Sequence, residues 1–143
     1  MSKSSAFKLC AAFVFSAVAS GCSEHVFLKI FNDTPTSLAL SGCGASVSVA
    51  PGSIAEIDPV TCGGEIRLEG AAGSWRYRVP ISDHGVYPSG ASYYHRRGTL
   101  FWQSALVLLQ INADHTLWAL PDGTGFPLRG KITQPDGFPI APR

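Results

Sequence analysis

The sequence predicts an all-β fold, a small antiparallel β-sandwich of about seven strands with a Pro/Gly-rich C-terminal arm. The chain has 143 residues, a length that suits one domain. Its apolar segments are short and are separated by turn-forming residues at intervals of about eight to ten residues, a spacing typical of sandwiches and barrels. Ser, Thr, Gly, Pro and Val together outnumber Lys, Glu and Gln, which disfavours a helical architecture.

Composition also limits the function. Apolar residues make up 45% of the chain, which is enough for a buried core and excludes wholesale disorder. The formal net charge is only +1. Nucleic-acid binding requires a basic stripe that neutralises phosphates, so nucleic acid is not expected as the main partner.

Residues 1–21 read as a signal peptide. Lys3 and Lys8 provide a positive start, and the uncharged apolar run that follows covers 9–19. This run is much shorter than the roughly 20 residues that a membrane-spanning helix needs. The mature domain is therefore expected at 22–120, and the arm at 121–143.

Two cleavage sites compete at the end of this segment. Ala17-Val18-Ala19 is an A-x-A site, whose use would release a soluble periplasmic or secreted protein beginning at Ser20. Ala19-Ser20-Gly21-Cys22 resembles the lipobox of bacterial lipoproteins, although members of that class usually carry Leu where Ala19 stands. The resemblance implies that Cys22 is acylated, for instance with palmitate, and becomes the first residue. With Ser23 next, it also implies the periplasmic face of the outer membrane.

The cysteine count favours the lipoprotein interpretation. Cys10 is removed with the signal peptide under either interpretation. Cleavage after Ala19 would leave three thiols in an oxidising compartment, whereas acylation of Cys22 leaves only Cys43 and Cys62. We expect these two to form a disulfide, which would stabilise the fold by about 3 kcal/mol for a loop of this length.

The first half of the mature chain contains four short strand-like segments. Residues 26–31 are apolar on either side of Lys29, alternate around it as a strand does, and end at the turn-forming run Asn32-Asp33-Thr34-Pro35. Three further segments are predicted at 37–40, 45–50 and 53–58, and Pro51-Gly52 separates the last two.

The clearest hairpin joins 65–69 to 74–79 through Gly and Ala residues. Directly opposed residues share a face, so the apolar positions limit the register to two possibilities. One sets Glu65 opposite Arg78, and the other sets Glu69 opposite Arg76. The arginines of this hairpin suggest either an anion site or a solvated ladder of alternating charge, and the ladder is favoured.

The second half begins with a long irregular stretch at 82–98. Residues 99–112 are the most apolar part of the mature chain, and 105–111 suit a central strand covered on both faces, with Gln110 as its polar exception. A short helix before this strand is an alternative. Residues 116–120 should return as its antiparallel partner.

The arm at 121–143 contains an internal repeat, a Pro-Asp-Gly turn followed by Gly-Phe-Pro, which recurs 14 residues later. We expect the arm to lie over the domain, with Phe126 and Phe138 as apolar pegs. A Pro-rich ligand for an aromatic groove in a partner is the alternative.

Motifs for catalysis or cofactor binding are missing from the sequence. It has no C-x-x-C, no G-x-S-x-G and no glycine-rich phosphate loop before a helix. The four histidines show no metal-ligand spacing. Asp83, His84 and Ser89 could form a triad by residue type alone. The sequence thus predicts a protein that is not an enzyme and holds no cofactor and no metal.

One segment has the composition of a binding surface. Tyr, Trp and Arg are enriched at interface hot spots, and here they gather with one histidine in the set Tyr93, Tyr94, His95, Arg96, Arg97 and Trp102. The alternative is that one tyrosine closes the end of the core while the arginines are solvated.

These observations predict a lipid-anchored, non-catalytic binding or scaffolding module of the cell envelope. Its partner would be an envelope protein, a glycan or a lipid that contacts residues 82–102. One alternative is a small periplasmic hydrolase or metal-dependent enzyme. Another is a structural subunit of an envelope assembly that docks through the arm.

Overall fold

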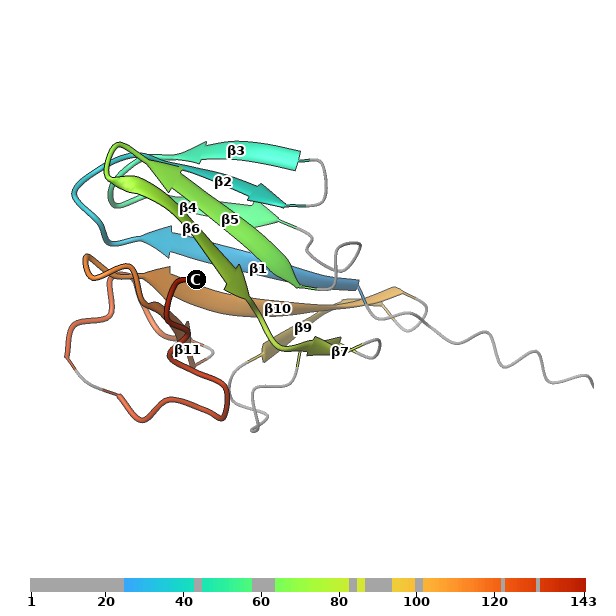
Figure 1. The fold of residues 1–143 in the computed structure, drawn as a ribbon. Helices are drawn as coiled ribbons and strands as arrows, with labels where there is room; N and C mark the ends of the chain where they lie inside the picture. The colour runs from blue at the N-terminus through green and yellow to red at the C-terminus, as the bar shows by residue number, and fades with distance from the viewer. Residues whose placement is uncertain are drawn as a thin grey trace, which may run out of the picture.

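The fold is an all-β sandwich, as predicted. A computed structural model describes residues 25–42, 45–57, 64–82, 85–86, 94–99, 102–121, 123–130 and 132–143. These residues contain eleven strands and no helix. Figure 1 shows two main sheets packed face to face. The count exceeds the expected seven mainly because the chain also forms short strands where irregular structure was expected.

The first sheet has the order β11-β10-β1-β4. Its strands are β1 (His25–Asn32), β4 (Ile54–Ile57), β10 (Trp102–Ile111) and β11 (Leu117–Leu120). A fifth strand, β9 (Tyr94–Thr99), also pairs with β10. β9 and β11 follow one another along the same edge of β10, because β1 occupies its other edge.

The second sheet has the order β3-β2-β5-β6. Its strands are β2 (Leu38–Gly42), β3 (Ala45–Val49), β5 (Glu65–Gly70) and β6 (Gly73–Arg78). A separate two-stranded ribbon joins β7 (Ile81–Ser82) to β8 (Gly85–Val86). The four strand-like segments predicted in the first half of the chain correspond to β1 to β4.

One pairing differs from the expected antiparallel arrangement. β1 and β10 run parallel, from His25 opposite Ser104 to Asn32 opposite Ile111. Parallel neighbours need a long connection, and here the whole second sheet and the β7–β8 ribbon lie between the two strands in the sequence. Alternation within each strand carries no information on this choice of partner, so the one parallel pair in the predicted sandwich could not be foreseen.

The core lies between the sheets and comes from the inward-facing positions of each strand. Leu28 and Ile30 of β1 are opposite Val107 and Leu109 of β10, and all four side chains are at most 1% exposed. The second sheet contributes Leu38, Leu40, Ile66, Leu68 and Tyr77, which are equally buried. Burial of such side chains supplies most of the driving force for folding.

β10 is continuous from Trp102 to Ile111, so the described residues of this segment contain a strand and not the short helix that was the alternative. As predicted, β10 is a central strand, and Gln110 is buried at 2% exposure. The prediction of irregular structure over 82–98 was wrong for 94–98, which belong to β9, and for 85–86, which form β8. Because this stretch contains several Gly and polar residues, its sequence did not show the pattern from which a strand is predicted.

The hairpin of β5 and β6 has the first of the two predicted registers, with Glu65 opposite Arg78. Pairing continues to Gly70 and Gly73, leaving Ala71 and Ala72 in the turn. Gly73 has a φ of 146°, a backbone conformation that residues with a side chain rarely adopt.

The arm packs against the domain through both predicted phenylalanine pegs. The rings of Phe126 and Phe31 stack with centroids 5.0 Å apart, and Phe138 joins the core cluster at 8% exposure. The arm also forms an isolated bridge between Ile140 and Leu117 of β11. The described part of the arm is therefore integral to the fold.

Two glutamine side chains hold the arm in place. Leu128 N donates to Gln110 Oε1 at 2.8 Å, and Gln110 Nε2 donates to Leu128 O at 3.2 Å. In the same way, the amide of Gln134 exchanges two hydrogen bonds with the backbone of Ala119 on β11. Each side-chain amide thus donates one hydrogen bond to a backbone carbonyl and accepts one from a backbone N–H, as a neighbouring strand would. This explains why Gln110 is the one polar residue of the otherwise apolar segment 105–111 of β10.

Candidate functional site: an arginine-lined groove beside β6

The predicted binding surface is only partly within the described structure. The backbones of Tyr94, His95, Arg96 and Arg97 belong to β9, and Trp102 begins β10. The register sets Arg97 opposite Ser104 and Thr99 opposite Trp102, so the segment forms one hairpin. Tyr93 lies outside the described residues.

Several other predicted functional residues also fall outside the described residues. These are the acylation candidate Cys22, the disulfide candidates Cys43 and Cys62, and the possible triad of Asp83, His84 and Ser89. Their proposed roles therefore stay predictions. Within the described part of the chain, no group of three or more His, Cys, Asp and Glu side chains could hold a metal ion.

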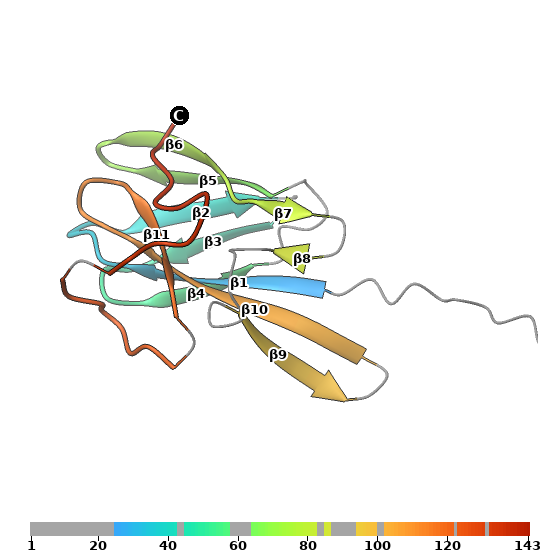
Figure 2. The same cartoon turned by 90° about the horizontal axis from the view of Figure 1, so that it is seen from below.

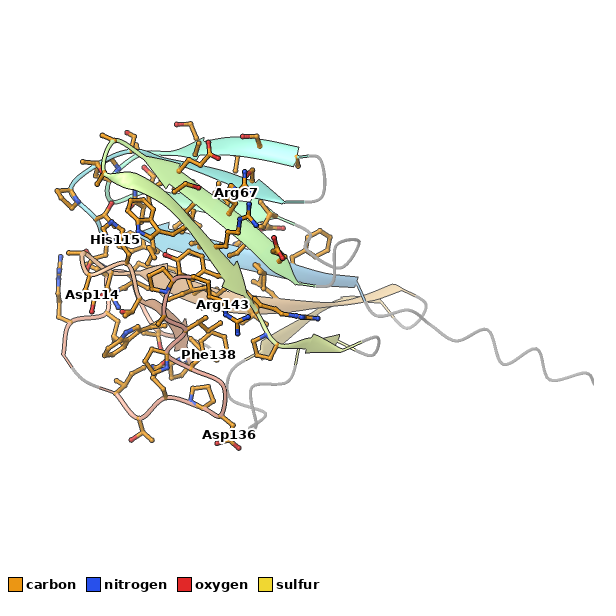
Figure 3. The ribbon with its side chains drawn as sticks, in the orientation of Figure 1. Arg67, Asp114, His115, Asp136, Phe138 and Arg143 are labelled. Atoms are coloured by element: carbon orange, nitrogen blue, oxygen red, sulfur yellow. The ribbon has the colours of Figure 1, made fainter. Side chains whose placement is uncertain are left out.

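A groove beside the edge strand β6 brings together charged side chains from distant parts of the chain. It has a volume of about 430 Å³ and is open to solvent. Its lining consists of Glu65 on β5, Arg76, Tyr77 and Arg78 on β6, and Arg143 in the arm. Figure 3 shows Arg143 beside β6, with Arg67 on the same sheet.

Arginines lie opposite one another across three neighbouring segments. Arg67 of β5 is directly opposite Arg76 of β6. Arg76 in turn exchanges two backbone hydrogen bonds with Arg143, of 3.3 and 3.0 Å. Residues opposed in this way share a face of the sheet. Arg67, Arg76 and Arg143 therefore form a row, which we call the arginine row.

The arginine row carries more positive charge than its neighbours neutralise. Arg67 forms an ion pair with Glu69, with 3.5 Å between Nη1 and Oε1. Arg76, Arg78 and Arg143 form no ion pair within 4 Å in the described part of the chain. Like charges directly opposite one another destabilise a sheet. The face therefore keeps part of the ladder of alternating charge that was favoured from the sequence, because Glu65 is opposite Arg78, but Arg67 and Arg76 are like charges opposite one another.

The arm positions the third member of the row. Gly137 has a φ of 85° in the turn before Phe138. A Cβ at Gly137 would make an ordinary contact with Pro80 Cγ at 3.4 Å, so it is the positive φ of this turn that favours glycine. Phe138 then enters the core, and the Ile140 bridge leads the chain back to β6. No pattern in the arm indicates which strand it pairs with, so Arg143 could not be predicted as part of this site.

Beneath the groove, Tyr77 holds β6 against the other sheet. Its side chain is 1% exposed, and its hydroxyl donates to His115 O at 2.8 Å. Burial, with a smaller contribution from the charge of Asp114, raises the pKa of Tyr77 well above its ordinary value. The phenol therefore stays protonated and keeps this hydrogen bond.

Trp75 and His115 extend this contact between the two sheets. Their rings stack with centroids 3.9 Å apart and an interplanar angle of 14°. His115 has a φ of 61°, in a turn that the side chain of Asp114 supports by accepting hydrogen bonds from Thr116 N and Oγ1. These hydrogen bonds hold the pKa of Asp114 below its ordinary value. The one histidine whose side chain is described thus has a packing role.

The groove can bind an anionic group, and its described residues offer no nucleophile with an adjacent base. Guanidinium groups suit carboxylates and phosphates because they donate several hydrogen bonds in a planar fork.

Among the described residues, no helix is long and apolar enough to span a membrane. No known protein family, curated protein or solved structure matches this chain.

Proposed function

We propose that the chain is a lipid-anchored, non-catalytic binding module of the cell envelope, which uses the arginine row to bind anionic side chains of an envelope protein. The anchor would be Cys22, and two joined cysteines, Cys43 and Cys62, would stabilise the domain. An acyl anchor suits a chain with little net charge, because such a chain has no broad basic surface for binding a membrane. The expected location is the periplasmic face of the outer membrane.

The observation that supports binding is the register of Arg67, Arg76 and Arg143. Three guanidinium groups lie on one face of three adjacent segments, and of these only Arg67 has an ion pair, with Glu69, in the described part of the chain. An anion bound between Arg76 and Arg143 would reduce the repulsion between like charges. Arg78 adds a fourth guanidinium to the groove, against two nearby carboxylates on β5, those of Glu65 and Glu69.

A protein partner is proposed because the groove runs beside an edge strand that already accepts an extended chain. Residue 143 pairs with β6 at Arg76 as an additional strand would. An acidic segment in extended conformation could lie next to it, a known mode of peptide recognition. An acidic glycan would present similar anionic groups and is the alternative ligand.

The test uses a fluorescein-labelled glutamate-rich peptide as the probe and measures its fluorescence anisotropy with the full-length protein. We expect binding that weakens as salt is raised, because salt screens exposed charges over about 10 Å. Replacing Arg76 and Arg78 together by Gln should weaken binding about tenfold, since two exposed charge contacts supply roughly 1.4 kcal/mol.

A matched control removes the same charge elsewhere. Lys29→Gln with Arg129→Gln eliminates two cations whose ion pairs, with Glu56 and Asp33, lie away from the groove. This control should bind the peptide as the wild type does. Equal binding by both double variants would refute the groove as the site. Preference for polygalacturonate over the peptide would point to a glycan ligand instead.

The two other hypotheses require different evidence. A hydrolase would need Asp83, His84 and Ser89 within hydrogen-bond reach of one another, and all three lie outside the described residues. Docking through the arm would have to use its exposed side, because Phe138 is buried and Gln134 is occupied by Ala119.

A further inference from the structure

The last residues of the arm join the two sheets of the sandwich. Ile140 exchanges two backbone hydrogen bonds, each of 2.9 Å, with Leu117 of β11, an edge strand of the first sheet. Three residues later, Arg143 exchanges backbone hydrogen bonds with Arg76 of β6, an edge strand of the second sheet. Figure 2 shows the arm passing from β11 to β6. Residues 140–143, which we call the strap, therefore connect the two sheets.

The strap has little slack. Packed sheets lie about 10 Å apart, and three residues in fully extended conformation span only about 10–11 Å. The chain between Ile140 and Arg143 must therefore be nearly straight. Pro142 favours this conformation, because its ring restricts φ and biases the residue before it toward extended backbone.

The strap starts from a fixed position on the first sheet. Ile140 packs against the core cluster, which Phe138 joins at 8% exposure. Before it in the chain, the side-chain amide of Gln134 forms two hydrogen bonds, of 2.9 and 3.1 Å, with the backbone of β11. These contacts determine which residue of the arm reaches β6. They therefore place Arg143 in the arginine row.

Resting on the proposed binding of anionic side chains by the arginine row, we infer that the strap regulates this site: Pro142 and the length of the strap position Arg143, and a bound anion in turn holds the strap against β6. Arg76 and Arg143 form no ion pair within 4 Å in the described part of the chain. Their repulsion favours release of the strap, and an anion between them would reduce it. Such coupling is reciprocal: if the closed strap strengthens anion binding by some factor, the anion stabilises the closed strap by the same factor.

The first experiment changes the length of the strap. One glycine inserted between Ala141 and Pro142 would bring proline opposite Arg76, and proline has no N–H to replace the one that Arg143 donates to Arg76 O at 3.0 Å. The arginine would then leave the row. In the anisotropy assay with the glutamate-rich peptide, we expect about threefold weaker binding than for the wild type, because one exposed charge contact is lost.

The control is one glycine inserted after Gly125, where a Cβ would meet no atom within 4 Å. Because Gln134 follows this point and fixes the register on β11, the control should bind the peptide as the wild type does. Arg143→Gln should weaken binding as much as the insertion in the strap. The two changes together should weaken it no further, since a residue pair that acts through one contact is not additive.

The second experiment uses the unaltered protein and measures hydrogen exchange of the backbone amides by NMR. Saturating peptide should slow exchange of Arg143 N–H about threefold, the same factor as in the affinity. Pro142→Gly should speed this exchange at least twofold, because glycine makes the released strap more flexible. Asn112 N–H, which donates to Thr116 O in the turn before β11, is the control and should not respond.

The outcomes separate the strap from the proposed function. If the wild-type protein does not bind the peptide, the proposed function is refuted, and the regulation with it. If the wild type binds but the insertion in the strap binds equally well, or if peptide leaves exchange of Arg143 N–H unchanged, the role of the strap is refuted and the binding function is kept. Unchanged exchange in Pro142→Gly would refute Pro142 as a positioning residue.

Discussion

Asn32 is the residue whose replacement gives the sharpest test of this fold. It ends β1, is fully buried, and uses its whole side-chain amide. Nδ2 donates to Thr36 O and Val49 O, both at 2.9 Å. Oδ1 accepts from Thr34 N at 3.0 Å and from Thr34 Oγ1 at 2.7 Å. One side chain therefore joins the first strand of one sheet to the end of β3 in the other.

The expected cost of Asn32→Ala follows from the groups left without partners. Thr34 N and Val49 O would both lose a buried hydrogen bond, whereas Thr34 Oγ1 could still donate to Thr36 O at 3.0 Å. Each buried unsatisfied group costs about 1–3 kcal/mol. We therefore expect a loss of about 3–4 kcal/mol, a large part of the 5–15 kcal/mol typical of a whole domain.

The assay is urea unfolding at neutral pH, followed by far-UV circular dichroism. Asn32→Asp should be at least as unstable as Asn32→Ala, because a carboxylate oxygen would face two backbone carbonyls in place of the amide donor. Asn112→Ala is the matched control. It removes the same group from a half-buried site, where Gln110 Nε2 keeps an alternative acceptor in Leu128 O. Equal losses at positions 32 and 112 would refute the argument.

Three further predictions concern the arm and the turn beside it. Phe138→Ala should reduce the free energy of unfolding by about 3 kcal/mol, measured in urea, because it empties a buried site in the core. Tyr77→Phe should cost about 1 kcal/mol at neutral pH through the lost hydrogen bond to His115 O. Because the pKa of Tyr77 is raised in the folded protein, the stability that it contributes is complete below the pKa of 10.0 of the unfolded chain and is lost as pH rises above that value. In alkaline unfolding monitored by circular dichroism, the free energy of unfolding should therefore fall less steeply with pH in Tyr77→Phe than in the wild type. The lowered pKa of Asp114 has the opposite pH dependence, because it stabilises the folded protein above pH 3.8. The wild type should therefore have a higher melting temperature than Asp114→Ala at neutral pH, and this difference should disappear as pH falls below about 3.8.

Much of the local structure could be predicted from the sequence because it depends on neighbouring residues. Alternation and a short turn limited the register of β5 and β6 to two possibilities, and the structure has the one that places Glu65 opposite Arg78. The two phenylalanine pegs were predicted from a repeat in the arm. In both cases the interactions that decide the outcome are encoded within a short segment.

The arrangements that depend on distant segments could not be predicted. The parallel pairing of β1 with β10 does not change the pattern of apolar and polar residues within either strand, so this pattern cannot identify the partner. The arginine row needs the backbone of Arg143 to meet Arg76, residues 67 positions apart in the chain. Gln110 looked like an exception on an apolar strand, and only the position of Leu128 shows why an amide is needed there.

The parallel pairing at the centre of the first sheet has a consequence for the order of synthesis. β1 is synthesised first but cannot pair until β10 has been made. Nearly three quarters of the polypeptide must therefore be synthesised before the hydrogen bonds between β1 and β10 can form. Contacts between residues so far apart in sequence slow folding, because a long loop must close before they contribute. A chain exported while still growing would therefore stay unfolded until most of it had crossed the membrane, and truncation at any point before β10 should leave a product open to proteolysis.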